Sequence, residues 1–386
     1  MNNAGQHFSV LVAHPSADLY GSDRVLLETI EGLVQSGARV LVTLPASGPL
    51  IPELERRGAA VVLSPTPVLR KSMLTAPGML RLAAGSVHGL LRSLGVVRGA
   101  RPDVIMANTI TVPLWTVVGR LAGIPVVTHV HEAEANASRA LRAALALPLL
   151  LSSGILTNSQ FSADTLADAL PALRGRATVL YNGVRGPARP VPPRDGLDGG
   201  LRILYIGRLS HRKGVDVAID ALLRLRRDGV EARLDVVGAV FPGYEDYETG
   251  LREQVAANGA EGQVTFHGFQ DDVWPFLAGS DVVVVPSRLD EPFGNTAVEA
   301  VLASRPVVVS NTSGLREAAA GYGSAQFVEP GDSARLAAAL AGVSAGWQDY
   351  RAKAQLDSAV AELRHSPEHY GKLMAGHLAD AAGRRR

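Results

Sequence analysis

The chain has no cysteine among its 386 residues, which excludes disulfides, thiolate nucleophiles and cysteine-based zinc sites. It also has no Gly-x-Gly-x-x-Gly pattern behind a strand and no Walker A pattern, so a dinucleotide dehydrogenase or a P-loop NTPase would lack its phosphate-binding loop. Asp-x-Asp pairs and histidine–acid clusters of the metal-binding kind are absent from the sequence as well. We therefore expect neither a metal ion nor a cofactor.

Charged residues are also few, at 19% of the chain, and the net charge is only +1, while 47% of the residues are apolar. This composition favours a folded protein over a disordered or fibrous one, and the length predicts two domains. The first apolar run, Phe8–Ala13, follows no basic segment and stops at His14-Pro15, which predicts a strand and not a signal peptide. We expect a cytoplasmic protein, associated at most with the inner face of the cell membrane.

Apolar runs alternate with helical patterns along the chain, which predicts an α/β fold with parallel sheets covered on both faces. Seven candidate strands lie between Phe8 and Tyr181, and six lie between Leu201 and Val328. We expect a Rossmann-like domain over residues 1–186, a Pro- and Gly-rich linker over 187–200, a second Rossmann-like domain over 201–345, and closing helices over 346–386 that pack back toward the first domain. Two such domains imply a cleft between them, where ligands bind.

Basic residues are concentrated in residues 56–102, where eight Lys or Arg occur without an acid. Part of this segment, 77–97, has a helical pattern of leucines among small residues. Such a segment can contact an anionic membrane surface, or it can be the solvated face of an ordinary surface helix. Nucleic acid is not expected as a partner, because no aromatic residues are interleaved with these charges.

Two glutamates, Glu291 and Glu299, stand eight positions apart behind the apolar run 281–286, which predicts a buried strand. Glu299 belongs to a helical segment that begins near Asn295. A helix start offers unpaired N–H groups and a positive dipole end, which suit a phosphate. The two carboxylates would then hold hydroxyls on either side of a diphosphate, as in a nucleotide-sugar.

An alternative exists for Glu299. Thr296 and Glu299 have the spacing of a capping box, in which Thr296 is the N-cap and Glu299 reaches back to its N–H. Glu291 has no such structural explanation, since it lies in a loop at the carboxyl end of a strand, where open α/β sheets bind ligands.

Cations follow the first strand of the second half, in the segment from Gly207 to Gly214. Arg208 and Lys213 lie at the carboxyl end of their strand, as Glu291 does at the end of a later one. Two cations match the charge of a bridging diphosphate, and without a metal ion they would neutralise the leaving group. The alternative is a basic surface loop.

These residues together resemble the family 4 retaining glycosyltransferases, which have the GT-B fold of two Rossmann-like domains facing across an interdomain cleft. The resemblance covers nearly the whole chain. It rests on the glutamate pair, Ala300 and Pro306–Val309, supported by the segments 207–214, 181–184 and 266–269 and by the loop at Gly21. Two positions depart from the family pattern, where Ser22 and Ser304 replace glycines; Ser304 is expected to affect the end of its helix and not the chemistry.

The resemblance implies a role for each matching residue. Catalytic roles fall to His131, Glu291, Arg208 and Lys213, with Arg208 and Lys213 on the donor diphosphate and His131 near the reacting sugar. Donor-binding roles fall to Gly21, Phe269, Phe293, Gly294, Asn295, Thr296 and Glu299, with Glu299 on the ribose and Phe269 near the base. His129 and His131 alternate at the end of a predicted strand; a functional role is expected for His131 and a structural one for His129.

We therefore expect a retaining glycosyltransferase that moves a hexose from a UDP- or GDP-sugar to a hydroxyl of a glycan or lipid-linked acceptor, in synthesis of the cell envelope or an exopolysaccharide. The first domain would bind the acceptor and the second the donor. Other interpretations remain: an enzyme with a small-molecule acceptor, a non-catalytic nucleotide-sugar-binding protein of the same fold, or an epimerase or phosphorylase.

Overall fold

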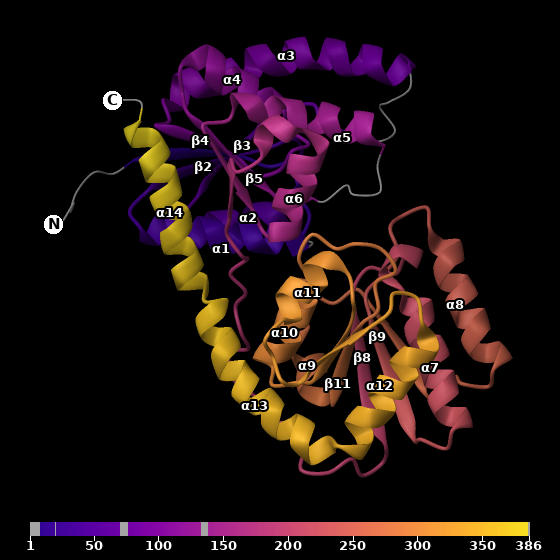
Figure 1. Cartoon of the computed structure of the whole chain (residues 1–386). Helices are drawn as coiled ribbons and strands as arrows, with labels where there is room; N and C mark the ends of the chain where they lie inside the picture. Colours follow the sequence, from indigo (N-terminus) through magenta and orange to yellow (C-terminus); the bar gives the residue numbers. More distant parts are fainter. Residues whose placement is uncertain (1–7, 20, 70–75, 133–137, 385–386) are drawn as a thin grey trace. The chain divides into compact units, whose positions relative to one another are not determined.

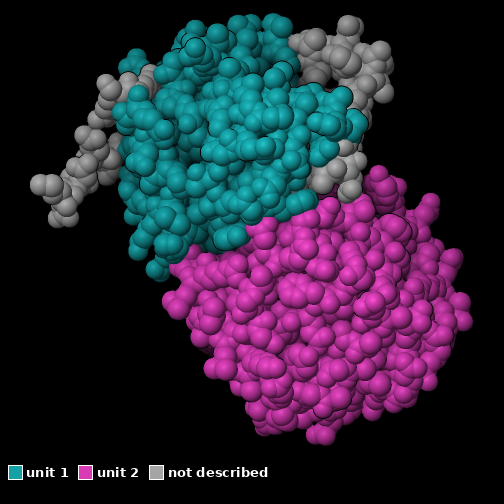
Figure 2. Space-filling view, in the orientation of Figure 1, with its two compact units in different colours: residues 1–183, 367–386 teal, residues 184–366 magenta. Residues whose placement is uncertain are grey.

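The chain divides into two units that each contain one parallel sheet (Figures 1 and 2). Unit 1 comprises residues 1–183 and 367–386, and unit 2 comprises residues 184–366. The computed structural model describes residues 8–19, 21–69, 76–132 and 138–384, with the backbone alone for 76–84. Both units have the α/β architecture that the alternating pattern predicts.

The sheet of unit 1 has seven parallel strands in the order β3-β2-β1-β4-β5-β6-β7. They are β1 (Ser9–Ala13), β2 (Arg39–Leu44), β3 (Ala60–Leu63), β4 (Val104–Ala107), β5 (Val126–Val130), β6 (Gly154–Thr157) and β7 (Ala177–Val179). Their number agrees with the seven candidate strands predicted between Phe8 and Tyr181. The strand order reverses between β1 and β4, which are neighbours in the sheet although β2 and β3 separate them in the chain.

Helices cover both faces of this sheet (Figure 1). They are α1 (Gly21–Gln35), α2 (Leu50–Arg56), α3 (Ala76–Ala100), α4 (Leu114–Ala122), α5 (Arg139–Ala146), α6 (Gln160–Ala169) and α14 (Pro367–Gly383), with the 3-10 helices η2 (Leu147–Leu151) and η3 (Pro171–Leu173). Helix α4 shows why they end where they do. Gly123 follows it with a φ of 64°, a left-handed conformation that glycine adopts without strain.

The last helix, α14, belongs to unit 1 and crosses α1 at very short range. A Cβ added to Gly371 would lie 2.7 Å from the Cα of Gly32, and one added to Gly32 would lie 2.4 Å from the Cα of Gly371. Beside this crossing, the hydroxyls of Tyr370 and Thr29 are 2.7 Å apart. Two glycines therefore allow a C-terminal helix to join the core of the N-terminal sheet.

The sheet of unit 2 has six parallel strands in the order β10-β9-β8-β11-β12-β13. They are β8 (Leu201–Ile206), β9 (Ala232–Val237), β10 (Val264–Gly268), β11 (Val282–Val285), β12 (Val307–Ser310) and β13 (Ala325–Val328). All four residues of β11 are buried valines, because helices cover both faces of the sheet. Here the strand order reverses between β8 and β11.

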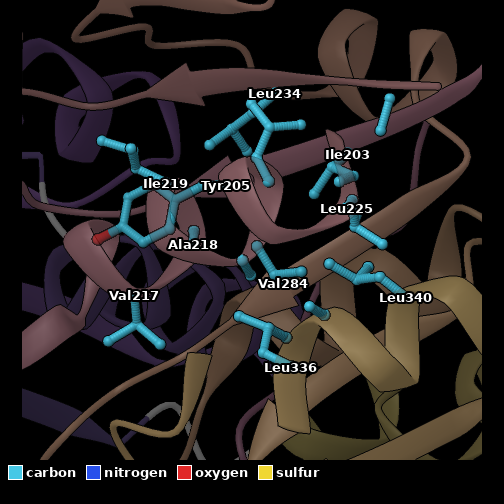
Figure 3. Close-up of a cluster of buried hydrophobic side chains, with 14 of the residues drawn as sticks. Ile203, Tyr205, Val217, Ala218, Ile219, Leu225, Leu234, Val284, Leu336 and Leu340 are labelled. Atoms are coloured by element: carbon cyan, nitrogen blue, oxygen red, sulfur yellow. The ribbon is translucent and has the colours of Figure 1, made fainter. Parts of the chain in front are cut away.

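The helices of unit 2 follow its strands in turn. They are η4 (His211–Lys213), α7 (Val215–Arg227), α8 (Glu245–Ala257), α9 (Trp274–Gly279), α10 (Asn295–Leu302), α11 (Ser313–Ala319), α12 (Ser333–Ala345) and α13 (Trp347–Arg364). Figure 3 shows side chains of α7 and α12, among them Leu225 and Leu336, packed on those of the sheet. Across both units, no helix within the described residues is long and apolar enough to cross a bilayer.

The Pro- and Gly-rich segment 187–200 is fixed to unit 2 by buried ion pairs and hydrogen bonds. Arg194 donates to both carboxylate oxygens of Asp281, at 2.7 and 2.6 Å. Arg305, which is 1% exposed, donates to the carbonyl of Val191 at 3.1 Å. The segment is thus held along its length despite a composition typical of linkers.

The α1–α14 crossing yields a direct test of packing. We expect Gly371→Val to lower the free energy of unfolding by about 1–3 kcal/mol or more, because the added side chain meets backbone, which cannot move aside. Urea unfolding measures the change. Gly376→Val on the same helix is the control, since a Cβ there meets nothing within 4 Å. Equal stability of the two variants would contradict the close crossing.

Candidate functional site

The loops after β8 and β11 meet where the strand order of unit 2 reverses. A Cβ added to Gly214, whose φ is 68°, would lie 2.0 Å from the carbonyl oxygen of Pro286. The backbone N–H of Arg288 donates to the carbonyl of Arg212 at 2.9 Å. Ligands of open α/β sheets bind at the carboxyl edge beside such a reversal. The fold therefore brings the predicted cation loop and the predicted glutamate loop together at this edge.

Glu291 is the centre of the polar contacts between these loops. Its Oε1 lies 2.8 Å from the Nζ of Lys213 and 3.1 Å from a guanidinium nitrogen of Arg212, and it accepts a hydrogen bond of 2.8 Å from Ser287. The side chain of Glu291 is only 6% exposed. Burial alone would raise the pKa of this carboxyl, but Lys213 and Arg212 outweigh burial and hold the pKa below its ordinary value. The pair Lys213–Glu291 thus joins two of the predicted catalytic residues.

Burial lowers the pKa of Lys213, and the nearby charges of Arg212 and Arg208 lower it further, while Glu291 opposes this change. Three cations therefore lie within electrostatic range of one another, and Glu291 contacts two of them, Lys213 and Arg212. Such a group is prepared to bind an additional anion. Arg208 and Lys213 are predicted from the sequence, whereas Arg212 is not, because its role depends on the fold of η4.

Arg208 is positioned by two aromatic residues. Its backbone carbonyl accepts a hydrogen bond of 2.9 Å from the hydroxyl of Tyr205, a buried residue of β8 whose ring packs in the core shown in Figure 3. The guanidinium carbon of Arg208 lies 3.4 Å from the centroid of the Phe241 ring. Since Phe241 follows β9, the loops of three adjacent strands contribute to this edge of the sheet.

Helix α10 begins at Asn295, as predicted, and Gly294 is its N-cap residue. Gly294 has a φ of 133°, and a Cβ there would lie 2.5 Å from Leu315. Thr296 lies inside the first turn, so the capping box with Thr296 as N-cap is wrong. Glu299 is half-buried one turn further along. The structural explanation offered for Glu299 is therefore not the one that the helix uses.

The other predicted residues of unit 2 differ in exposure. Phe293 is 2% exposed, and its ring lies 5.9 Å from that of His365, so its side chain belongs to the interior. Phe269 is 49% exposed and follows β10, two strands away from β8. The structure thus groups Glu291, Lys213 and the start of α10, and it places Phe269 further along the same edge.

Ser304 adopts a φ of 58°, a left-handed conformation directly after the C-cap of α10. This is the position where glycine is common, and its backbone N–H donates to the carbonyl of Val301 at 2.9 Å. The expectation that Ser304 affects the end of the helix is therefore confirmed.

A second polar network occupies the corresponding reversal in unit 1. His14 follows β1, Asn108 follows β4 and His131 follows β5 by one residue. The Oδ1 of Asn108 lies 3.0 Å from the Nε2 of His131. The Nδ2 of Asn108 lies 3.1 Å from the Nδ1 of His14. The Nε2 of His14 lies 2.7 Å from a carboxylate oxygen of Asp23, on α1. These four side chains form one continuous hydrogen-bonded chain.

Of these four side chains, only His131 is predicted from the sequence as a site residue. His14, Asp23 and Asn108 are all at most 2% exposed. The signal that would have found two of them is their position, since each is the first residue after one of two adjacent strands. Gly21, the predicted donor contact in this unit, is the first residue of α1, and a Cβ there would meet nothing within 4 Å.

Burial is the main cause of the low pKa values of both histidines near the end of β5. The pKa of His131 falls to about 3: burial is the largest cause, a positive charge on His14 would add to it whenever His14 is protonated, and Asp23 opposes it. The pKa of His129 lies well below 6.5 because of burial and of His131, whose ring centroid is 4.0 Å away. His129 is fully buried, and neither of its ring nitrogens has a hydrogen-bond partner among the described residues.

Glu132, the next residue, is held by Thr109, whose hydroxyl donates to its carboxylate. Burial raises the pKa of this carboxyl despite that hydrogen bond and those from the backbone N–H groups of Ile110 and His131. Among the described residues, no group of three or more acids and histidines is arranged to hold a metal ion.

Comparisons with known proteins agree with this architecture. The model of the family described as "Glycosyl transferases group 1" matches residues 195–355, and that of "Glycosyltransferase Family 4" matches residues 20–185. Two parallel-sheet units with these matches define a GT-B protein. The chain belongs to the group 1 and family 4 glycosyltransferases, a class of transferases.

Individual relatives extend the likeness. A glycogen synthase of Mycobacterium tuberculosis is 31% identical over 265 residues, which cover 66% of this chain and 63% of the synthase. A 2-deoxystreptamine glucosyltransferase of Streptomyces kanamyceticus is 27% identical, over 81% of this chain and 86% of that enzyme. The crystal structure of Anabaena Alr3699/HepE with UDP and glucose has a TM-score of 0.81 and 24% identity, and covers 97% of this chain and all of that one. This structural likeness shows the shared fold.

The lowered pKa values of His129 and His131 predict that the folded protein loses stability in acid. Between pH values of about 3 and 6.5, the unfolded chain binds protons that folded His131 does not, and His129 acts in the same direction. Stability should therefore fall as the pH drops below 6.5, by about 1.4 kcal/mol per pH unit for each fully displaced proton. We expect His129→Leu to reduce this slope and to add about 1–3 kcal/mol at neutral pH, because it removes unpaired buried nitrogens.

Urea unfolding at several pH values measures both effects. His88→Leu, at an exposed position of α3, is the control and should keep the wild-type slope. An unchanged slope in His129→Leu would show that His129 is charged or solvated in the native protein.

Proposed function

We propose that this protein transfers a sugar from a nucleotide diphosphate-sugar to an acceptor hydroxyl, with retention of configuration at the anomeric carbon. The observation that carries the proposal is the group formed by Lys213, Arg212 and Glu291 beside the start of α10. It combines several cations, a carboxylate and the positive end of a helix dipole at the sheet edge where ligands bind. Family membership supports the same activity.

The donor would lie on unit 2 with its diphosphate toward the cations. Arg208 and Lys213 would contact the diphosphate, and we add Arg212 as a third cation. The remaining roles follow the family expectation: Glu291 and the backbone of Phe293, Gly294 and Asn295 on sugar hydroxyls, Thr296 near the phosphates, Glu299 on the ribose, Phe269 near the base, and Gly21 from unit 1 near the phosphate. Three protein cations can stabilise a departing diphosphate without a metal ion.

Glu291 would have two roles in this scheme. Before the donor binds, it keeps Lys213 charged and in place at a distance of 2.8 Å. With the donor present, its second oxygen can accept hydroxyl hydrogens of the sugar. No further carboxylate is proposed as a nucleophile, so a front-face displacement assisted by the departing phosphate fits better than a covalent intermediate.

The acceptor would bind to unit 1. The proposed acceptor is a glycan or lipid-linked glycan of the cell envelope or an exopolysaccharide, and the proposed donors are UDP- or GDP-hexoses. The structure of the Anabaena protein with UDP and glucose makes UDP-glucose the first donor to assay. The similarity to a 2-deoxystreptamine glucosyltransferase favours including that aminocyclitol as a small-molecule acceptor.

Substitutions at Lys213 and Glu291 test this assignment. We expect Lys213→Ala to weaken the binding of both UDP and UDP-glucose about 10- to 100-fold, because it removes a charged hydrogen bond to the diphosphate. Glu291→Gln should weaken UDP-glucose more than UDP, because it contacts the sugar. Both variants should lose nearly all transfer, measured as UDP released from UDP-glucose with and without acceptor, and calorimetry measures the affinities.

Two ion-paired residues on the surface of unit 2 provide controls. Lys353→Ala removes a lysine 2.6 Å from Asp349, and Glu248→Gln changes a glutamate 2.7 Å from Arg252. Both should bind and transfer normally. Wild-type turnover in Lys213→Ala and Glu291→Gln would refute the assignment, while donor binding without any UDP release would favour a non-catalytic binding protein.

We also propose that unit 1 contacts an anionic membrane surface. Large apolar side chains are exposed on three elements that pack together, α3, α4 and η2. They include Val87 and Leu91 at 64% and 66% exposure, Leu121 at 62%, Leu147 at 56% and Leu151 at 43%. These three elements contain no acid, and Arg92, Arg98 and Arg120 are exposed on them. Apolar side chains surrounded by cations suit an anionic lipid surface.

This surface refines the expectation for residues 56–102. Arg70 and Lys71 and the side chain of Arg81 lie outside the described residues. Arg56 and Arg57, in the earlier part of the segment, are paired with Glu53 on α2 and are not included in the proposed lipid contact. The proposed lipid contact is therefore made by α3, α4 and η2 and not by the segment as a whole.

Vesicle sedimentation tests the lipid contact. We expect the protein to bind vesicles of phosphatidylglycerol and phosphatidylcholine, to release at high salt, and to bind pure phosphatidylcholine weakly. Leu91→Glu with Leu121→Glu should reduce binding about 10-fold or more, because two apolar contacts are lost and two repelling charges are gained. Leu356→Glu with Leu363→Glu, at exposed positions of α13, is the control. Equal binding by both double variants would refute this surface.

A further inference from the structure

With His14 neutral, only one arrangement of protons satisfies all four side chains of the network that joins Asp23, His14, Asn108 and His131. A carboxylate can only accept hydrogen bonds, so the Nε2 of His14, 2.7 Å from Asp23, must carry a hydrogen. A neutral His14 then has a lone pair on Nδ1. The nearby atom of Asn108, at 3.1 Å, must be the amide NH2 group, which donates to that lone pair.

The same reasoning determines which nitrogen of His131 carries the hydrogen. With its NH2 group turned toward His14, Asn108 turns its carbonyl oxygen toward the Nε2 of His131, 3.0 Å away. A carbonyl oxygen can only accept, so this Nε2 also carries a hydrogen. In neutral His131 the other nitrogen, Nδ1, then has the lone pair. The orientation of the Asn108 amide therefore follows from the carboxylate at the far end of the chain.

We propose that Asp23, His14 and Asn108 are positioning residues that hold His131 in the tautomer protonated on Nε2, so that its Nδ1 accepts a hydrogen bond from a substrate hydroxyl. This inference rests on the proposed function in one respect, namely that the partner of Nδ1 is a hydroxyl of the sugar or the acceptor. The tautomer itself depends only on the contacts within unit 1.

The state of His131 decides what this nitrogen does. Its pKa of about 3 keeps the imidazole neutral and makes it a weak base. His131 would therefore accept a hydrogen bond and orient a hydroxyl without removing its proton, so it is not a general base in this scheme. Three aligned donors that end on a carboxylate increase the acceptor strength of Nδ1, because hydrogen bonds in a chain polarise one another.

The positions of the four residues in the fold support the positioning role. His14, Asn108 and His131 lie at the ends of β1, β4 and β5, three strands that are adjacent in the sheet. Asp23 is on α1, the helix that follows β1. Three of the four side chains are at most 2% exposed, while His131 is half-buried. The network thus begins in the interior and ends at its least buried member, His131.

Nuclear magnetic resonance of the full chain labelled with 15N-histidine tests the tautomer without any substrate. We expect His131 to give the signals of a neutral ring protonated on Nε2, identified by their loss in His131→Gln. Asn108→Leu removes both amide contacts, so His131 should become a mixture of tautomers. Asn158→Leu is the matched control, because Asn158 is a buried asparagine directly after β6, and it should leave His131 unchanged.

Kinetics then test the function of the tautomer. In Asn108→Leu we expect kcat for UDP-glucose to fall about 10-fold or more while the affinity for UDP, bound on unit 2, stays within about twofold of wild type. His131 protonated on Nδ1 in the wild type, or an unchanged tautomer in Asn108→Leu, would overturn the positioning role. A confirmed tautomer with unchanged kinetics would overturn the hydroxyl contact, and a protein without transferase activity would refute the proposed function while leaving the tautomer result intact.

Discussion

A parallel sheet whose strand order reverses at its middle constrains where this protein can do chemistry. From β8 the chain continues to β9 on one side, whereas β11 continues to β12 on the other. The loops of β8 and β11 therefore face each other at one edge with little regular structure between them. Unit 1 repeats this arrangement at β1 and β4. In both units buried polar side chains that contact one another lie at this edge, with Glu291 and Ser287 in unit 2 and His14 and Asn108 in unit 1.

The cost of burying charge explains why the group in unit 2 has the composition it has. Glu291 can remain ionised at 6% exposure only because Lys213, Arg212 and Ser287 together offset its lost hydration. Lys213 in turn depends on Glu291, since burial among cations favours its neutral form. The group is therefore held in its charged state before any ligand binds, and the diphosphate of the proposed donor would meet cations that are already oriented.

Most of the fold could be predicted from the sequence, because its helices and strands follow from residue patterns that are local in the sequence. The valines of β11 and the start of α10 at Asn295 are examples, and so is Ser304 after the helix. The capping box failed because Gly294, with a φ of 133°, starts the helix without a side-chain cap. Arg212, His14 and Asn108 were missed for another reason: their partners come from strands distant in sequence, and strand order is not a local property.

The two edges differ in electrostatic character, and each suits a different kind of chemical group. The edge of unit 2 is ionic, with three cations in range of one carboxylate, and it suits a diphosphate, whose charge persists throughout the reaction. The network of unit 1 ends in an imidazole that stays neutral down to a pH of about 3. A neutral acceptor suits a hydroxyl, because it can orient the O–H without competing for the proton. An imidazolium in its place would repel the positive charge that develops on a sugar ring as its leaving group departs. Burial of His131 therefore has a chemical consequence as well as a structural one: it keeps the imidazole neutral at neutral pH.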